Sequence, residues 1–214
     1  MTDEYGQDQM AHPLPDAAIV DRLEWLVDRC RGRRVIHVGF ADVSFRDDQL
    51  ATESWLHQHL AEVADSLVGI DLEPEAVDRA RAQGYEVHAA DCTDADQLAG
   101  LDLEPADLVI AGEVIEHVGD PGGLLGALRT LCRPDGALIV TTPNAYGLRN
   151  VVASIGGFEL NHPDHVVMFT LRTLTSLMTR SGWDPVAAHT YVPQVRSLPT
   201  ASRKRLVMAV GERA

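Results

Sequence analysis

The sequence is poor in cysteine and has no long apolar run. Its 214 residues include three cysteines, Cys30, Cys92 and Cys132, with no CxxC spacing. An odd number of widely separated cysteines predicts neither a disulfide framework nor a zinc–thiolate site, and it favours a reducing compartment. No apolar run approaches the ~20 residues of a membrane span, and residues 1–10 are polar and acidic, unlike a secretory signal. We therefore expect a cytoplasmic protein that does not bind membranes.

Basic residues are also scarce. Lysine and arginine number 18 against 32 aspartate and glutamate residues, which gives a formal net charge of −14. A field of this sign repels polyanions, so nucleic acid is disfavoured as a partner. The proportions of hydrophobic residues (45%) and charged residues (23%) are typical of one folded domain. We expect a flexible arm over residues 1–15 and a single domain over residues 16–214, either monomeric or oligomeric.

Apolar, β-type runs alternate with helical patterns along the chain. Five runs predict strands, at residues 33–39, 66–71, 85–90, 107–111 and 137–141. One helix is expected to start at an Asp16 N-cap, to include Ile19 in its apolar stripe and to end near Cys30, and another is expected to start at about Val114. Two further β-type runs, at 185–192 and 206–210, predict an antiparallel hairpin. The alternation indicates an α/β fold with a parallel sheet covered by helices on both faces.

Acidic residues end two neighbouring predicted strands. Ligands of parallel sheets bind beyond the carboxyl ends of the strands. A carboxylate can accept two hydrogen bonds from vicinal hydroxyls, so Asp71 is placed to hold a ribose, and Asp91 could bind the exocyclic amine of an adenine. Both acids could instead cap the helices that follow them. Their positions at successive strand ends favour a nucleoside ligand.

Six segments occur in an order that resembles class I S-adenosylmethionine-dependent methyltransferases. They are residues 35–39 (VIHVG), 68–71 (VGID), 90–91 (AD), 107–118 (DLVIAGEVIEHV), 131–136 (LCRPDG) and 141–144 (TTPN). The match covers residues 35–214, and the chain is most similar to the ubiquinone-biosynthesis O-methyltransferases. The resemblance implies a Rossmann-like, seven-stranded, mostly parallel sheet with an antiparallel last strand, which agrees with the predicted hairpin. It also implies S-adenosylmethionine as cofactor.

The resemblance further implies which residues bind that cofactor. Gly39 and Ala41 would approach the methionyl part of the cofactor, and the turn containing Gly112 and Glu113 would approach its amino-acid end. Asp71 with Leu72 would bind the ribose. Asp91 with Cys92 would bind the adenine. The first loop departs from the family pattern, which has an acid two residues before the first glycine and further glycines after it. This chain has His37 at the acid position and Val43 where a glycine is usual. We interpret His37, in a buried strand, as a core residue.

The segment around His117 predicts a cation site. Glu113, Glu116 and His117 are three and four residues apart, so on a helix they would share a face and could bind Mg²⁺ or another divalent cation. The segment is also similar to that of small-RNA 3′-terminal 2′-O-methyltransferases, in which a distant histidine completes the metal site. His162, or His165, could do so here. Many members of the fold have a similar Glu-His pair without a metal, and both interpretations stay open.

The same histidines are candidate catalytic groups. His117, His162 and His165 could each take a proton from an attacking hydroxyl, because an unperturbed imidazole titrates near pH ~6.5. Alignment of the nucleophile with the methyl group could also supply much of the rate without a base. The stretch around residues 145–168 follows the fifth predicted strand, where a substrate lid would lie.

These observations favour an S-adenosylmethionine-dependent methyltransferase that acts on a hydroxyl of a small molecule or a sugar. The alternative enzyme is an RNA 3′-terminal 2′-O-methyltransferase, which the net charge of −14 opposes. The alternative from another class is a non-catalytic cofactor-binding module, which the altered first loop favours.

Overall fold

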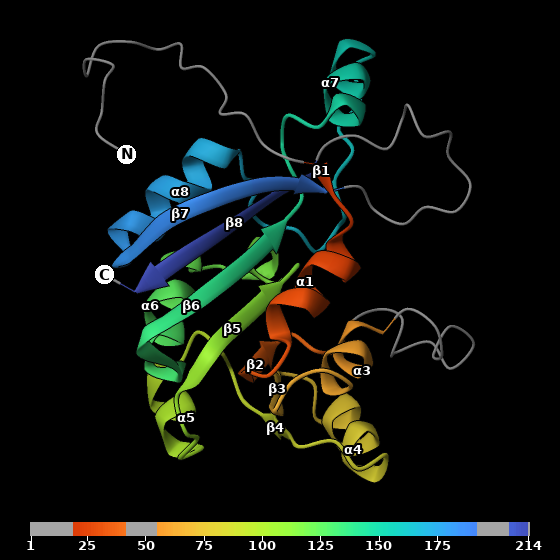
Figure 1. Cartoon of the computed structure of the whole chain (residues 1–214). Helices are drawn as coiled ribbons and strands as arrows, with labels where there is room; N and C mark the ends of the chain where they lie inside the picture. The colour runs from red at the N-terminus through yellow and green to blue at the C-terminus, as the bar shows by residue number, and fades with distance from the viewer. Residues whose placement is uncertain (1–18, 42–54, 192–205, 214) are drawn as a thin grey trace.

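The chain folds around one eight-stranded sheet. The computed structural model describes residues 19–41, 55–191 and 206–213, the last of these as backbone. The strands lie in the order β1-β7-β8-β6-β5-β2-β3-β4 (Figure 1). Their bounds are β1 Ile19–Val20, β2 Arg34–Val38, β3 Ser66–Asp71, β4 Val87–Ala89, β5 Ala106–Gly112, β6 Cys132–Thr142, β7 Trp183–Tyr191 and β8 Leu206–Arg213. The helices are α1 Arg22–Cys30, α3 Leu56–Ala61, α4 Pro74–Ala82, α5 Ala95–Gly100, α6 Pro121–Leu128, α7 Leu148–Ile155 and α8 Leu171–Arg180, with 3₁₀ turns η1 Ile115–His117 and η2 Arg129–Leu131.

The strand directions confirm the predicted Rossmann-like sheet. β8 runs antiparallel to both of its neighbours, β6 and β7, whereas β2, β3, β4, β5 and β6 pair in parallel. The C-terminal hairpin is therefore present as expected. The sheet has one strand more than the seven expected, because residues 19–20 pair in parallel with β7 through Ile19↔Thr190 and Val20↔Tyr191.

The start of the first helix differs from the prediction. Ile19 was assigned to a helix capped by Asp16, but it lies in β1, and α1 begins at Arg22. Asp21 is the N-cap, and its carboxylate accepts a hydrogen bond from the backbone nitrogen of Glu24 at 3.0 Å. The two β-branched residues before Asp21 extend along β7, so the chain turns into the helix later than the apolar spacing indicated. Asp16 and the predicted arm over residues 1–15 lie outside the described residues.

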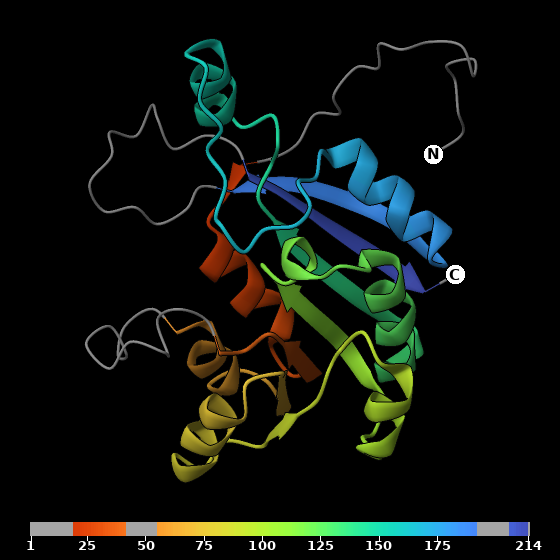
Figure 2. The same cartoon turned by 180° about the vertical axis from the view of Figure 1, so that it is seen from behind.

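Alternate side chains of the central strands enter two separate layers. Ile36 and Val38 pack with side chains of α5, α6 and α8, whereas Val35 packs with Leu26 of α1 and Leu60 of α3. Figure 1 shows α1, α3 and α4 on the near face of the sheet, and Figure 2 shows α5, α6 and α8 on the other face. Both faces of the central sheet are thus covered, which explains why its strands read as continuous apolar runs.

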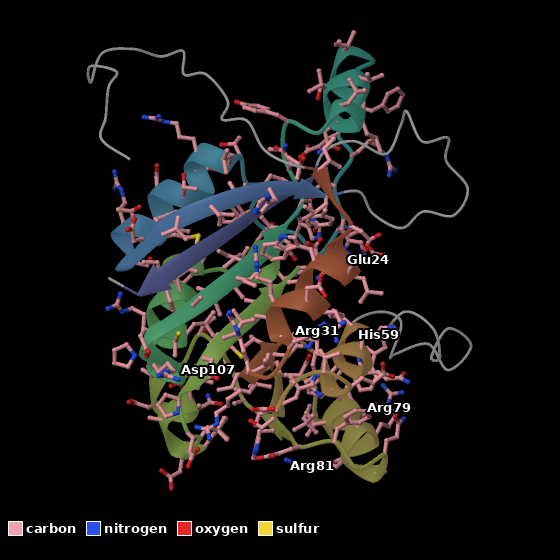
Figure 3. The ribbon with its side chains drawn as sticks, in the orientation of Figure 1. Glu24, Arg31, His59, Arg79, Arg81 and Asp107 are labelled. Atoms are coloured by element: carbon pink, nitrogen blue, oxygen red, sulfur yellow. The ribbon has the colours of Figure 1, made fainter. Side chains whose placement is uncertain are left out.

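The two edges of the sheet carry different chemistry. At the amino ends of the strands, the Asp107 carboxylate (labelled in Figure 3) accepts a hydrogen bond from the Arg34 backbone nitrogen at 2.8 Å and pairs with Arg133. These charges satisfy one another. The carboxyl ends of β2, β3 and β5 meet at the opposite edge, from which α7 projects away from the body in Figures 1 and 2. Within the described part of the chain, every helix is too short or too polar to cross a membrane.

Candidate active site

The loop after β2 requires glycine at its first position. Gly39 has a φ of 70°, and a Cβ there would lie 2.2 Å from Cγ2 of Val114. The Gly39 nitrogen donates to the Ile70 carbonyl at 2.8 Å, and the Ala41 nitrogen donates to Oδ2 of Asp71 at 3.0 Å. The predicted cofactor residues Gly39, Ala41 and Asp71 are therefore adjacent at one edge of the sheet.

The acids at the ends of β3 and β4 do not act as helix N-caps. Asp71 accepts at Oδ1 from the Glu73 nitrogen at 3.0 Å, but the N-cap of α4 is Glu73. Asp91 accepts from the nitrogen and hydroxyl of Thr93 at 2.9 and 2.7 Å, and the N-cap of α5 is Asp94. The capping alternative is thus wrong for both acids in its simple form, although each stabilises the turn that follows it.

The neighbours of these two acids are apolar. Leu72, beside Asp71, is 68% exposed. Cys92 is nearly buried, and burial, followed by the charges of Asp71 and Asp91, raises the pKa of its thiol to about 12. Cys92 is therefore a neutral wall residue and not a nucleophile.

The turn after β5 is strained and is held by side chains. Glu113 has a φ of 56°, which non-glycine residues seldom adopt outside functional sites. Its Oε1 accepts hydrogen bonds from the Thr141 hydroxyl at 3.0 Å and from the Tyr191 hydroxyl. Burial and the Glu113 charge raise the pKa of Tyr191 well above its ordinary value, so the phenol remains a donor. The Glu113 turn is thereby fixed to β6 and β7.

Arg22 belongs to the site, although sequence analysis missed it. Its guanidinium donates to the Thr141 hydroxyl at 3.3 Å, lies over the Tyr191 ring at 5.7 Å and occupies the space where Gly112 has no side chain. Its Nε has no hydrogen-bond partner among the described residues. The helix predicted from Asp16 placed Arg22 beyond its first turn, so the unfavourable position of a basic residue at the start of a helix became visible only with the observed start of α1.

The predicted cation site is rearranged. The helix expected from about Val114 is one 3₁₀ turn, η1, so Glu113 does not share a face with Glu116 and His117 and instead points to Tyr191. Potential ligand atoms of Glu116, His117 and His165 lie within 4.8 Å of one another. His162 is outside this group, with its Nδ1 3.3 Å from the Asp164 nitrogen. Of the predicted candidates, the structure therefore groups Glu116, His117 and His165, and it leaves out Glu113 and His162.

The three grouped side chains differ in exposure and charge. Glu116 is fully buried, and neither of its carboxylate oxygens makes a hydrogen bond of ordinary geometry to the described residues, although the Thr142 hydroxyl and the Glu116 backbone act to lower its pKa. Burial, with a contribution from the Glu113 charge, raises the pKa of Glu116 to about 8. The pKa of His165 is lowered by burial and then by His117 and His162. A buried carboxyl group without an ordinary hydrogen bond is costly, and a neighbouring cation would offset that cost.

The predicted lid segment leaves the sheet and returns to it. The Ala145 nitrogen donates to the Phe169 carbonyl at 2.8 Å, and the Val166 nitrogen donates to the Glu116 carbonyl at 2.9 Å. No residue of α7 is buried. Eight of the eleven exposed large apolar side chains reported for the described residues lie in this segment: Tyr146, Leu148, Val151, Val152, Ile155, Phe158, Leu160 and Val166. An apolar surface of this kind beside a candidate site indicates a contact surface.

Known proteins share both the sequence pattern and the fold. Residues 51–188 match the methyltransferase domain family. A ubiquinone biosynthesis O-methyltransferase of Aeromonas salmonicida is 31% identical over 130 residues, which cover 58% of this chain and 50% of that protein. The chain spans about half the length of the curated relatives that it matches first.

Two solved structures show the same fold. A possible histamine N-methyltransferase of Thermotoga maritima superposes with a TM-score of 0.62 and 15% identity, covering 92% of this chain and 90% of that one. The N-methyltransferase NodS of Bradyrhizobium japonicum, solved with S-adenosylhomocysteine, has a TM-score of 0.57 and 16% identity, covering 90% and 88%. At these identities the likeness concerns the fold alone. With the domain match over most of its length, the chain belongs to the S-adenosylmethionine-dependent methyltransferase family.

Proposed function

We propose that the chain transfers a methyl group from S-adenosylmethionine to a hydroxyl of a small molecule or saccharide. The observation that carries this proposal is the meeting, at one sheet edge, of the glycine loop, the buried acid Asp71 and the Glu113 turn. Parallel sheets bind ligands at this edge. O-methylation has support from two of the curated relatives, which are named for that reaction.

The residues of this edge suit the three parts of the cofactor. Asp71 would bind the ribose hydroxyls, with Leu72 covering the sugar. Asp91 would bind the adenine amine, with Cys92 as a neutral wall. Gly39 and Ala41 would approach the methionyl chain of the cofactor, and the Gly112–Glu113 turn would bind the amino group of that chain. The Arg22 guanidinium, which stands against Gly112, would pair with the carboxylate of the same chain.

The acceptor would lie between the η1 turn and the lid. The cofactor supplies an activated methyl group, and the protein's part is to align the hydroxyl with it and to accept the proton. His165 suits the second task, because its lowered pKa keeps the imidazole neutral, and His117 packs against it with ring centroids 4.6 Å apart. His162, whose ring is 6.2 Å from that of His117, is a further candidate base. The apolar segment 145–168 would cover the acceptor and exclude water.

A direct test of this function is a calorimetric titration with S-adenosylhomocysteine. Micromolar affinity, about −8 kcal/mol, is expected. Transfer of labelled methyl groups to a panel of phenols, saccharides and amines would then identify the acceptor atom. Labelling confined to amines would refute O-methylation, and cofactor binding without any transfer would favour the non-catalytic module. RNA labelling with a steep salt dependence would favour the RNA alternative.

We propose, as an alternative to a His165 base, that Glu116, His117 and His165 hold a divalent cation, in which case His162 would accept the proton. Two imidazoles and one buried carboxylate without an ordinary hydrogen bond form a plausible donor set, and the imidazoles favour Mn²⁺, Fe²⁺ or Zn²⁺ over Mg²⁺. The test is Mn²⁺ binding, followed by calorimetry, in wild type and in Glu116→Gln. Glu75→Gln is the control, because Glu75 is an exposed acid on α4 outside the cluster. Full activity in chelator, or equal Mn²⁺ affinity in wild type and Glu116→Gln, would refute the site.

A cytoplasmic location remains our expectation. All three cysteines are free and buried, which is consistent with a reducing compartment. Fractionation of cells that express the full chain would test it.

A further inference from the structure

The first cofactor loop rests on a buried group of rings that the proposed function does not use. Phe40, between Gly39 and Ala41, is fully buried, and its carbonyl accepts a hydrogen bond from Trp55 Nε1 at 2.7 Å. Its ring lies 5.1 Å from the ring of His57 on α3. The loop is therefore attached through Phe40 to α3, on the side away from Asp71's contact with Ala41.

Two histidines complete this group. Nδ1 of His37 lies 3.2 Å from Nδ1 of His57, and both side chains are buried, 3% and 0% exposed. His37 stands two residues before Gly39, at the position where the family pattern has an acid. Because two neutral imidazoles can form this hydrogen bond only if one donates and the other accepts, the pair fixes opposite tautomers in the two rings.

The surroundings keep both rings neutral. Burial, then the charges of His57 and Arg22, lowers the pKa of His37 well below its ordinary value, and burial lowers that of His57 to about 4. The groups that face the pair are Arg22 from α1, and Trp55 and Tyr85, whose rings lie 5.2 and 5.4 Å from that of His57. None of them is an acid that would stabilise an imidazolium.

We propose that His37 and His57 are positioning residues, whose mutual hydrogen bond holds residues 39–41 in the cofactor-binding arrangement in place of the acid and the later glycines of the family pattern. This inference rests on the proposed cofactor site. His37 fixes the strand end that leads into Gly39, and His57 fixes the ring of Phe40, so the bond between them connects both sides of the loop. A proton on the accepting Nδ1 would place two N–H groups against each other and break the bond, and a proton elsewhere on either ring would leave a buried charge with no acid among the facing groups.

The test compares His57→Phe with wild type in S-adenosylhomocysteine binding at neutral pH. Phenylalanine keeps the ring packing and removes the nitrogen, so a loss of about one neutral hydrogen bond, roughly fivefold in affinity, is expected. His59→Gln is the matched control on the same helix (labelled in Figure 3), and its affinity should not change. Near-ultraviolet circular dichroism and the cooperativity of thermal unfolding would establish that each variant is folded.

A pH profile separates positioning from simple packing. Wild-type affinity should be constant down to about pH 5 and should fall as the pH approaches the His57 pKa of about 4, and this fall should be smaller in the double variant His37→Leu/His57→Phe, which lacks both imidazoles. Should that variant not fold, nitrogen-15 spectra of the wild-type imidazoles must show one protonated and one bare Nδ1 at neutral pH. Equal affinity in wild type and His57→Phe, equal pH profiles, or matching tautomers would overturn the positioning role alone. No binding by wild type at neutral pH would overturn the cofactor site itself.

Discussion

Replacement of Gly39 by alanine should destabilise the protein through two separable effects. The backbone at Gly39 has a φ of 70°, a left-handed conformation that costs an alanine about 1–2 kcal/mol. The added Cβ would also meet Cγ2 of Val114 at 2.2 Å, far below van der Waals contact. Val114 packs against the main core cluster and cannot move freely, so overpacking adds about 1–3 kcal/mol.

Gly32 provides a matched control for the first effect. It has nearly the same φ, 64°, but a Cβ there would meet no atom within 4 Å. Gly32→Ala should therefore lose about 1–2 kcal/mol, from backbone strain alone, and Gly39→Ala about 2–5 kcal/mol. For a domain of this size each kcal/mol corresponds to about 2–4 °C in Tm.

The measurements are urea unfolding for stability and calorimetry for the cofactor. Gly39→Ala should also weaken S-adenosylhomocysteine binding, because relief of the clash displaces either the loop at Gly39 or the Val114 segment, whereas Gly32→Ala should bind normally. If the two variants lose the same stability, the contact with Val114 does not constrain the loop. If Gly39→Ala is destabilised but binds the cofactor as wild type does, the loop is not part of the cofactor site.

Three further predictions concern single groups. Asp71→Asn should bind S-adenosylhomocysteine about 10- to 100-fold more weakly in calorimetry, because it loses charge-assisted hydrogen bonds, whereas the exposed Asp78→Asn should not change the affinity. The folded-state pKa of His57, about 4, lies below its ordinary 6.5, so its contribution to stability is complete above pH 6.5 and is lost as the pH falls toward 4. Between pH 6.5 and pH 4, the free energy of unfolding in urea should therefore fall by about 3 kcal/mol less in His57→Phe than in wild type. Tyr191→Phe should remove a donor to Glu113 and lower stability by about 1–3 kcal/mol, and an unchanged urea midpoint would show that the Glu113 turn does not depend on this bond.

Most of the fold could be predicted because its strands are apolar on both faces. The predicted strand over residues 66–71 coincides with β3, and the one predicted over residues 107–111 lies within β5. The prediction was wrong where tertiary pairing overrides local pattern. Ile19 fits the apolar stripe of a helix, but it pairs with β7 instead. No local pattern could have indicated this, because its partner Thr190 is far away in the sequence.

The candidate site was harder to predict than the fold. The acids at strand ends follow from the topology, so Asp71 and Asp91 could be identified from their positions alone. The cation group depends on the shape of a single turn, and a 3₁₀ turn in place of an α-helix separates Glu113 from Glu116. Whether His162 or His165 approaches His117 depends on how the predicted lid segment returns to the sheet, which no recognisable period in the sequence encodes.

Two glycines connect the proposed cofactor side of this edge to the proposed acceptor side. The missing Cβ of Gly39 makes room for Val114, which directly precedes η1, and the missing Cβ of Gly112 makes room for the Arg22 guanidinium. In each case glycine allows a side chain from another element to approach the backbone. The first loop is therefore packed against the turn that carries Glu116 and His117, and α1 is packed against the strained turn at Glu113. Substitution of either glycine by a larger residue should consequently alter both cofactor binding and the geometry of the acceptor side, although the two sides share no residue.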